Sequence, residues 1–177
     1  MKYIALTGPM YSGKTTLAMA LQERGYLKIG FADQLKQYAC EALEAVGVYA
    51  TVRQMNENKQ VYRAFLQSLG TLVDFDTDPA HIENAIAPWV ERGRPKAVFD
   101  NVRFNQQANT LHGYGFKLVQ IRVGLSVQYD RAAALGVTSE ALEIMMRHSC
   151  EQGVSNPYIS IDGTRSVEEN VELLINL

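Results

Sequence analysis

The stretch Gly8-Pro9-Met10-Tyr11-Ser12-Gly13-Lys14-Thr15 fits the pattern G-x-x-x-x-G-K-[ST] at every specified position. A short apolar run of β-type residues, 3–6, precedes it, and the run 16–21 consists of good helix formers. A strand, a glycine loop and a helix in this order are the context in which the pattern forms a phosphate-binding loop. The alternative is an ordinary glycine-rich turn between a strand and a helix. Because both flanks fit, we expect this protein to bind a nucleoside triphosphate.

The chemistry of such a loop gives two of its side chains a role. The glycines let several backbone N–H groups point at a polyphosphate, and the N-terminus of the following helix adds partial positive charge. Lys14 can then reach the β- and γ-phosphates, and the Thr15 hydroxyl can ligate Mg²⁺. A nucleoside triphosphate and Mg²⁺ are therefore the expected ligands.

The composition narrows the class of protein. The 177 residues are 47% hydrophobic, which suits a single domain over 1–177 with a full core. The net charge of −2 provides no global basic field for nucleic acid, although a local basic groove stays open. Two cysteines, Cys40 and Cys150, form neither a disulfide framework nor a C-x-x-C motif. The chain starts without the features of a signal peptide, and no run approaches the ~20 apolar residues of a membrane span. We therefore expect a cytoplasmic protein with no membrane partner.

Beyond the loop, β-type runs alternate with helical patterns. Helices are expected over 34–46 and, after the N-cap signal Asp78-Pro79, up to 93–95. Another helix is expected over 56–73, with a buried stripe of Val61, Phe65, Leu69 and Val73. The other expected strands are 26–32, 96–99, 117–123 and 158–161, and the other expected helices are 139–151 and 166–177. This alternation predicts a three-layer α/β fold, a parallel sheet of about five strands flanked by helices.

Two aspartates follow expected strands, and parallel sheets bind ligands at the carboxyl ends of their strands. Asp100 follows the strand 96–99; it can hold Mg²⁺ together with Thr15, or it can cap a nearby turn. Asp33 closes the strand 26–32; it can orient an acceptor oxygen or bind Mg²⁺ through water, or it can act as the N-cap of the next helix. Lys36, one helical turn later, can hold an acceptor phosphate.

Basic and amide side chains recur on the expected helix 56–73. Lys59, Arg63 and Gln67 share one face, opposite the stripe that begins at Val61. An arginine and a glutamine one turn apart can hold a monophosphate and the edge of a base. A solvated helix face is the more frequent outcome for such a stripe, so spacing alone does not decide between the two.

Four more arginines are candidate site residues of a kinase, because phosphoryl transfer depends on positioning and charge neutralisation. Arg103 lies within one turn of Asp100, and Arg122 ends an expected strand. Arg131 and Arg147 lie in the polar stretch between the last two strands. Each of them can also be an ordinary surface residue.

Five stretches after the phosphate loop carry further motifs in order. They are Phe31-Ala32-Asp33-Gln34-Leu35-Lys36, residues 62–71, Asn101-Val102-Arg103-Phe104, His148-Ser149-Cys150-Glu151 and Ile161-Asp162-Gly163-Thr164. They resemble F-A-D-x-L-K, R-x-x-L-Q-x-x-G-T, D-V-R-F, H-x-S-E and N-D-G-T of the phage-type deoxynucleoside monophosphate kinases. That family belongs to the adenylate kinase-like P-loop group, with the dephospho-coenzyme A kinases. The resemblance covers nearly the whole chain.

The resemblance implies transfer of the γ-phosphoryl group of ATP, with Mg²⁺, to a deoxynucleoside monophosphate. The residues implied for ATP are Gly8, Tyr11, Ser12, Gly13, Lys14, Thr15, Thr16, Gly163 and Thr164. Those implied for the acceptor are Asp33, Lys36, Arg63, Gln67 and Arg103, from a helical region over about 33–92. The implied catalytic residues are Lys14, Asp33, Arg103, Arg131 and Arg147, the last two on a lid over about 124–150. Thr15 and Asp100 would bind the metal.

Two departures from the family pattern keep other functions open. Asn101 stands where the family has an acid, and Gln107 stands where it has a glutamate. One alternative is therefore a kinase for a hydroxyl acceptor, either a dephospho-coenzyme A-like substrate or a hydroxymethylated base in phage DNA, with Asp33 as general base. The other is a nucleotide-binding regulator without turnover. Nucleic acid is a partner only in the first alternative, and a homodimer stays open.

Overall fold

The computed structural model describes residues 1–75, 78–147 and 153–177, with Lys59 and Gln60 described by their backbone alone. Five strands form one sheet, in which every pairing between neighbours is parallel, in the order β2-β3-β1-β4-β5. The strands are β1 (Tyr3–Thr7), β2 (Leu27–Ile29), β3 (Ala97–Phe99), β4 (Lys117–Arg122) and β5 (Ile159–Asp162). The predicted α/β fold with a parallel five-stranded sheet is confirmed.

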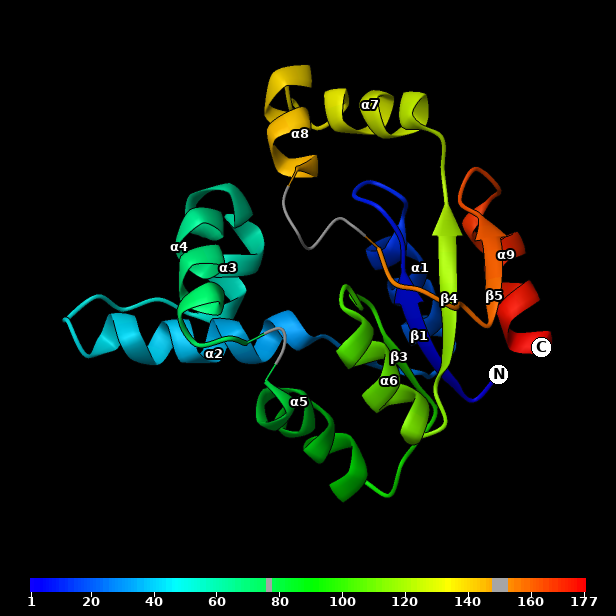
Figure 1. Ribbon diagram of the computed structural model, residues 1–177, viewed down its shortest axis with the longest axis horizontal. Helices are drawn as coiled ribbons and strands as arrows, with labels where there is room; N and C mark the ends of the chain where they lie inside the picture. The colour runs from blue at the N-terminus through cyan, green and yellow to red at the C-terminus, as the bar shows by residue number, and fades with distance from the viewer. Residues whose placement is uncertain (76–77, 148–152) are drawn as a thin grey trace.

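Helices cover both faces of this sheet (Figure 1). Ile4 and Leu6 of β1 point to one face, where they pack with Leu17 of α1 (Lys14–Glu23) and Leu174 of α9 (Val167–Asn176). Ala5 points to the other face. There the core includes Ile86 and Trp89 of α5 (Pro79–Glu91), Leu111 of α6 (Asn105–Gly113) and Phe99 of β3. The alternation along the strands thus builds two apolar cores, one on each side of the sheet.

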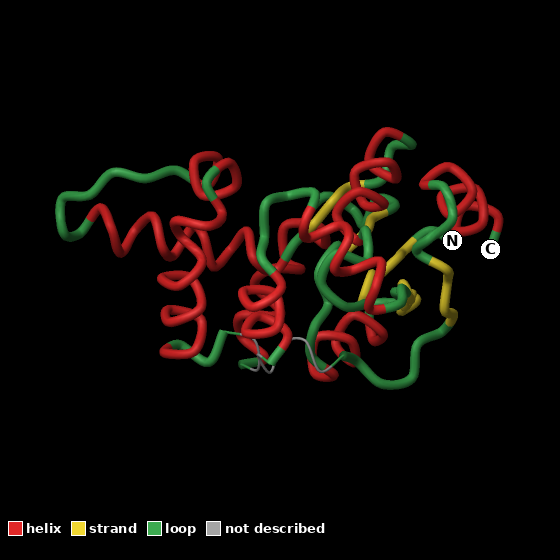
Figure 2. Tube along the Cα trace, turned by 90° about the horizontal axis from the view of Figure 1, so that it is seen from above, coloured by secondary structure: helices red, strands yellow, loops and turns green. Residues whose placement is uncertain are grey.

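Two groups of helices stand outside these layers. One is an arm made of α2 (Phe31–Glu44), α3 (Val52–Glu57) and α4 (Lys59–Leu72), which Figures 1 and 2 show extending to one side of the sheet. The other is the pair α7 (Leu125–Ala133) and α8 (Ser139–Met146), which lies beyond the carboxyl ends of the strands (Figure 1). The region predicted to bind the acceptor, 33–92, therefore divides: α2 to α4 form the arm, whereas α5 belongs to the core.

The prediction that Asp33 ends the second strand is wrong. Strand β2 stops at Ile29, and helix α2 begins at Phe31, so Asp33 lies in the first turn of α2. An acidic side chain is favoured there because it interacts with the positive end of the helix dipole. Asp33 still lies just beyond the carboxyl end of β2.

The prediction of one helix over 56–73 is also wrong. The chain forms α3 and α4, which meet at Asn58, a residue with φ −115° and ψ 45°. Val61 is 75% exposed, so it does not begin a buried stripe. Phe65, Leu69 and Val73 are half-buried. Among the positions of α4 whose side chains are described, Gly70 alone is fully buried, and a Cβ added there would lie 3.2 Å from Leu35. The helix is therefore rotated relative to the predicted orientation.

Other boundaries follow the sequence closely. Asp78 caps α5 by accepting a hydrogen bond from the Ala80 N–H, and Pro79 occupies the first helical position, as predicted. The helix predicted over 139–151 is observed as α8, up to Met146; the motif His148-Ser149-Cys150-Glu151 lies outside the described residues. None of the helices in the described ranges is long and apolar enough to cross a membrane.

Candidate active site

The phosphate-binding loop joins β1 to α1 in a conformation that requires glycine at Gly8. Gly8 has φ +145°, and a Cβ added there would lie 2.5 Å from the Ile121 carbonyl oxygen of the neighbouring strand β4. Gly13, with φ +98°, precedes the first residue of α1. Tyr11 also adopts a positive φ, 58°. The loop therefore bends close to β4 at the carboxyl end of β1, with its backbone beside the N-terminus of α1, where an anion can bind.

Lys14 lies within this loop and is 8% exposed. Its ammonium donates hydrogen bonds of 2.7 Å to the carbonyl oxygens of Gly8 and Pro9. Among the described residues, Ser12 Oγ is buried without a hydrogen-bond partner. A polyphosphate in the loop would offer acceptors to both groups.

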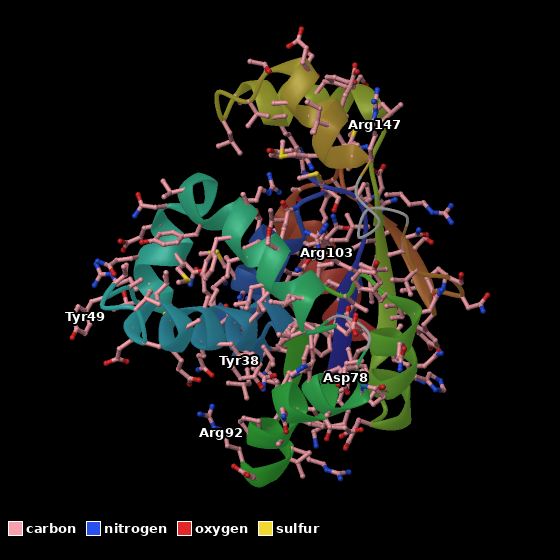
Figure 3. The ribbon with its side chains drawn as sticks, turned by 60° about the vertical axis from the view of Figure 1, so that its left-hand side comes forward. Tyr38, Tyr49, Asp78, Arg92, Arg103 and Arg147 are labelled. Atoms are coloured by element: carbon pink, nitrogen blue, oxygen red, sulfur yellow. The ribbon has the colours of Figure 1, made fainter. Side chains whose placement is uncertain are left out.

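A cleft of about 1260 Å³ opens from the loop toward the arm and the α7–α8 pair. Fourteen of the residues assigned a role from sequence line it. They are Tyr11, Ser12, Gly13, Lys14, Thr15, Thr16, Asp33, Lys36, Arg63, Gln67, Asp100, Arg103, Arg131 and Gly163. In the described part of the chain, the lining does not include Gly8, Thr164 or Arg147. Arg147 is exposed at the C-cap of α8, at the base of the upper helices in Figure 3.

Two carboxylates meet at Gly30, between β2 and α2. A Cβ added to Gly30 would lie 2.9 Å from Asp100 Oδ1 and 3.2 Å from Asp33 Oδ2, so the two oxygens are no further apart than the sum of these distances. The other oxygen of each carboxylate is paired with a lysine. Lys28 Nζ lies 2.8 Å from Asp100 Oδ2, and Lys36 Nζ lies 2.8 Å from Asp33 Oδ1. Sequence reasoning predicted Lys36 but missed Lys28.

Arg103 approaches the same place from the segment between β3 and α6, near the middle of the molecule in Figure 3. Its Nε donates a 2.8 Å hydrogen bond to Asn101 Oδ1. Gln107 is buried, and its Oε1 accepts hydrogen bonds from the backbone N–H groups of Arg103 and Phe104, at 3.0 and 3.3 Å. Gln107 therefore caps the start of α6 and fixes the backbone that carries Arg103.

Arg131 reaches the phosphate-binding loop from the last turn of α7. One of its terminal nitrogens donates to the Tyr11 carbonyl (2.9 Å) and the other to the Gly163 carbonyl (2.7 Å). The guanidinium thus bridges the loop and the turn after β5, with Nη1 3.7 Å from a Cβ added to Gly13. This position brings a fixed positive charge next to the loop.

One face of α4 turns toward the cleft. Arg63, Leu66, Gln67 and Gly70, at helical spacing, all line it. Arg63 Nη1 donates to Met145 Sδ of α8, so the arm and the α7–α8 pair touch across the cleft. The side chain of Lys59 is outside the described structure, and its predicted role stays a prediction.

The turn between β5 and α9 closes the cleft on the other side. Gly163 is buried, and a Cβ there would lie 2.7 to 2.8 Å from Ile121, Val123 and the Ser12 carbonyl. The backbone N–H and the hydroxyl of Thr164 both donate to Asp162 Oδ1, and they hold the pKa of the Asp162 carboxyl below its usual value. Thr164 therefore shapes this turn, while Gly163 allows it to pack against the phosphate-binding loop.

The donor set fits Mg²⁺. Thr15 is exposed at the start of α1, Asp100 lines the same cleft, and both offer the hard oxygen ligands that Mg²⁺ prefers. The ammonium of Lys28 already pairs with the Asp100 carboxylate, which shows that this carboxylate accepts a cation. Among the described residues, no group of three or more His, Cys, Asp or Glu side chains is arranged to hold a metal by itself. A Mg²⁺ ion here would thus need some of its ligands from a bound phosphate, as is usual for Mg²⁺ in such sites.

Comparison with known proteins identifies the type of fold. No family profile and no curated protein sequence matches this chain. Among solved structures, a sugar kinase from Janibacter matches with a TM-score of 0.56 and 12% identity, over 99% of this chain and 93% of that one. Shikimate kinase from Aquifex aeolicus matches with a TM-score of 0.54 and 16% identity, over 98% and 94%. A gluconokinase from Sinorhizobium meliloti matches with a TM-score of 0.53 and 17% identity, over 96% and 87%. This protein has the fold of the P-loop kinases.

Proposed function

We propose that this protein is an ATP-dependent phosphotransferase that phosphorylates a deoxynucleoside monophosphate to the diphosphate. The fold, the phosphate-binding loop and the lined cleft support a kinase. The choice of acceptor is supported by the chemistry of the arm side of the cleft and by the motif resemblance, which also supplies the deoxy sugar.

The loop side of the cleft suits the donor. The bent loop from Gly8 to Gly13, the N-terminus of α1 and the ammonium of Lys14 together form a concave, positively polarised surface for a triphosphate. Arg131 adds a fixed charge beside it. The base of the nucleotide would lie against the turn after β5, where Gly163 and Arg165 line the same cleft.

The arm side of the cleft supports this choice of acceptor, because apolar and cationic residues line it together. The apolar residues are Phe31, Leu35, Met55, Leu66 and Phe75. The cationic residues are Lys36, Arg63 and Arg103, accompanied by the amide of Gln67. A flat base suits the apolar residues, and a phosphate suits the cationic ones, because guanidinium groups bind phosphate oxygens as a fork. A nucleoside monophosphate combines both parts.

The proposed reaction needs little covalent chemistry from the protein. A phosphate monoester is mostly dianionic at neutral pH, so the attacking oxygen needs no general base. Arg63 and Arg103 would hold that phosphate in line with the γ-phosphate, while Lys14 and Arg131 neutralise the charge that develops during transfer. Thr15 and Asp100 would hold the Mg²⁺ that accompanies ATP, which would supply further neutralisation of phosphate charge.

A hydroxyl acceptor is the second candidate, and Asp33 is the observation that favours it. Its side chain is 46% exposed, it lines the cleft, and its Oδ2 lies beside Asp100. A carboxylate at this point can take the proton of an attacking hydroxyl. The structural neighbours named as sugar kinase, gluconokinase and shikimate kinase are compatible with this candidate.

The test is release of ADP from Mg·ATP in the presence of single acceptors. The panel contains the four common deoxynucleoside monophosphates, their hydroxymethyl variants, dephospho-coenzyme A, gluconate, shikimate and hydroxymethylated DNA. We expect turnover with at least one monophosphate and none in Lys14→Ala, which removes the phosphate-contacting ammonium.

The other outcomes are distinct. Turnover with a hydroxyl compound alone, abolished in Asp33→Asn while binding persists, would replace the main proposal with the second candidate. ATP binding without turnover on any acceptor would contradict both candidates and favour a nucleotide-binding regulator.

A further inference from the structure

We propose that Lys28 is the counter-ion of Asp100 and that Lys28 and Mg²⁺ compete for this carboxylate. Lys28 is thereby a positioning residue that sets the Mg²⁺ concentration at which the site binds Mg·ATP. This inference rests on the proposed function, because it takes Asp100 as a metal ligand.

The sheet brings the two side chains together. In the parallel register of β2 and β3, Lys28 is paired with Val98, and Ile29 with Phe99. The Asp100 N–H then donates a 3.1 Å hydrogen bond to the Ile29 carbonyl, which extends the pairing by one residue. Asp100 is therefore the diagonal neighbour of Lys28 on the same face of the sheet, within reach of a long side chain.

Gly30 makes the contact possible. It stands opposite Asp100, and a Cβ there would lie 2.9 Å from Asp100 Oδ1. Without that Cβ, the carboxylate can turn Oδ2 toward Lys28 Nζ, 2.8 Å away, and Oδ1 toward Asp33. The sequence Lys28-Ile29-Gly30 thus places a cation at i and an open space at i+2 on one face of β2.

Lys28 and Asp100 are partly shielded from water, which makes their ion pair important to both charges. The Lys28 and Asp100 side chains are 22% and 11% exposed, and a charge held away from water needs a partner. The neighbouring carboxylate of Asp33 is paired with a different lysine, Lys36. A divalent ion that binds Asp100 must therefore approach or displace the Lys28 ammonium, and like charges at short range repel.

Removal of the Lys28 ammonium should then let Mg²⁺ bind at a lower concentration. In Lys28→Met, we expect the Mg²⁺ concentration that gives half-maximal enhancement of ATP binding to fall at least fivefold, the lower end of ordinary coupling between bound species. In Lys28→Arg, this Mg²⁺ concentration should rise, because a guanidinium holds a carboxylate with two hydrogen bonds. The opposite directions keep the proposal testable if one of the variants folds poorly.

The measurement is calorimetric titration of ATP into the protein across a magnesium series that starts from EDTA. Lys117→Met, an exposed lysine at the far end of β4, controls for the change in net charge and should behave as the wild type. The decisive comparison is made in an Asp100→Asn background, where Lys28→Met should no longer shift the magnesium midpoint. A general electrostatic effect of Lys28 would persist there.

Three results would overturn the inference. An unchanged magnesium midpoint in Lys28→Met, or a shift that survives in Asp100→Asn, would mean that Lys28 does not act through Asp100. Weaker ATP binding in Lys28→Met at every magnesium concentration would make Lys28 a phosphate ligand. If the wild type binds no ATP at all, the proposed function fails together with this inference.

Discussion

Asn101 and Gln107 are amides at positions where the resemblance to the phage-type kinases leads one to expect acids. Asn101 Oδ1 accepts from Arg103 Nε, and Gln107 Oε1 accepts from two backbone N–H groups. An amide oxygen can make these hydrogen bonds without a negative charge. The two substitutions therefore keep the segment that carries Arg103 in order, and they leave Asp100 and Asp33 as the carboxylates at this end of the cleft.

Gln107 gives a direct test of that interpretation. We expect Gln107→Ala to lower the free energy of unfolding by about 1–2 kcal/mol, because two N–H groups at the start of α6 lose their acceptor. Gln107→Glu should stay within about 0.5 kcal/mol of the wild type, since a carboxylate accepts the same bonds and suits a helix N-terminus. Urea unfolding curves provide the measurement. An equal loss of stability in both variants would show that the cap is not what the amide contributes.

Arg63 tests the acceptor side of the cleft. Arg63→Met should raise KM for the monophosphate about 10- to 100-fold, the effect of losing charge-assisted hydrogen bonds to phosphate, with little change in KM for ATP. Arg53→Met is the matched control, because Arg53 lies on α3 and pairs with Glu57 at the surface. Steady-state kinetics with each substrate varied in turn would show the effect. A change in KM for ATP alone would place Arg63 on the donor side.

At the scale of secondary structure, the elements that could be predicted are those determined by interactions between residues close together in the sequence. The strand before Gly8, the loop and α1 follow from one motif, and α5 follows from Asp78 and Pro79. These elements depend on turn geometry, capping and propensity within a few residues. The motif at Gly8 also predicted a loop that the structure places in the lining of the large cleft.

The features that were missed depend on contacts between distant residues. The face of α4 that turns inward is set by the contact between Gly70 and Leu35 of α2, so spacing alone assigned Val61 to the wrong side. Asp33 was placed at a strand end because 26–32 mixes β-forming residues with Gly30, whereas β2 ends where its pairing with β3 ends. Lys28 escaped notice for the same reason: its partner Asp100 lies on another strand, seventy-two positions along the chain.

The turn between β5 and α9 carries a prediction about pH. Thr164 lowers the pKa of Asp162 in the folded protein, and in the unfolded chain the pKa returns to its ordinary value near 3.9. The folded state therefore binds fewer protons in this range, and the resulting stabilisation is present above about pH 4 and is lost as the pH falls through the lowered pKa. Asp162→Asn should be less stable than the wild type at pH 7, and the difference should shrink below about pH 4.

Thermal unfolding between pH 3 and pH 7 measures this difference. Glu44→Gln, which removes an exposed carboxylate at the end of α2, is the control for the loss of one negative charge. A constant difference between Asp162→Asn and the wild type at every pH would mean that the carboxylate charge plays no part in the turn.

At the scale of the whole molecule, the cleft is enclosed by three bodies: the sheet with its phosphate-binding loop, the arm, and the α7–α8 pair (Figure 1). Arg131 links the α7–α8 pair to the loop, and Arg63 links the arm to Met145 on the α7–α8 pair. Of the side chains proposed to bind the acceptor, Lys36 and Arg63 stand on the arm and Arg103 stands beside the sheet, so the cleft brings residues of separate elements to one space. In the proposed reaction, this arrangement would shield the reacting phosphates from water once both substrates are bound, which would limit hydrolysis of ATP.

The central claim is transfer of the γ-phosphoryl group to a monophosphate, and label transfer tests it most directly. The wild type is incubated with γ-³²P-ATP, Mg²⁺ and each of the four common deoxynucleoside monophosphates, with Lys14→Ala alongside, and the products are separated. We predict a labelled deoxynucleoside diphosphate from the wild type and none from Lys14→Ala. Label that remains in ATP, or that appears in inorganic phosphate alone, would contradict the account.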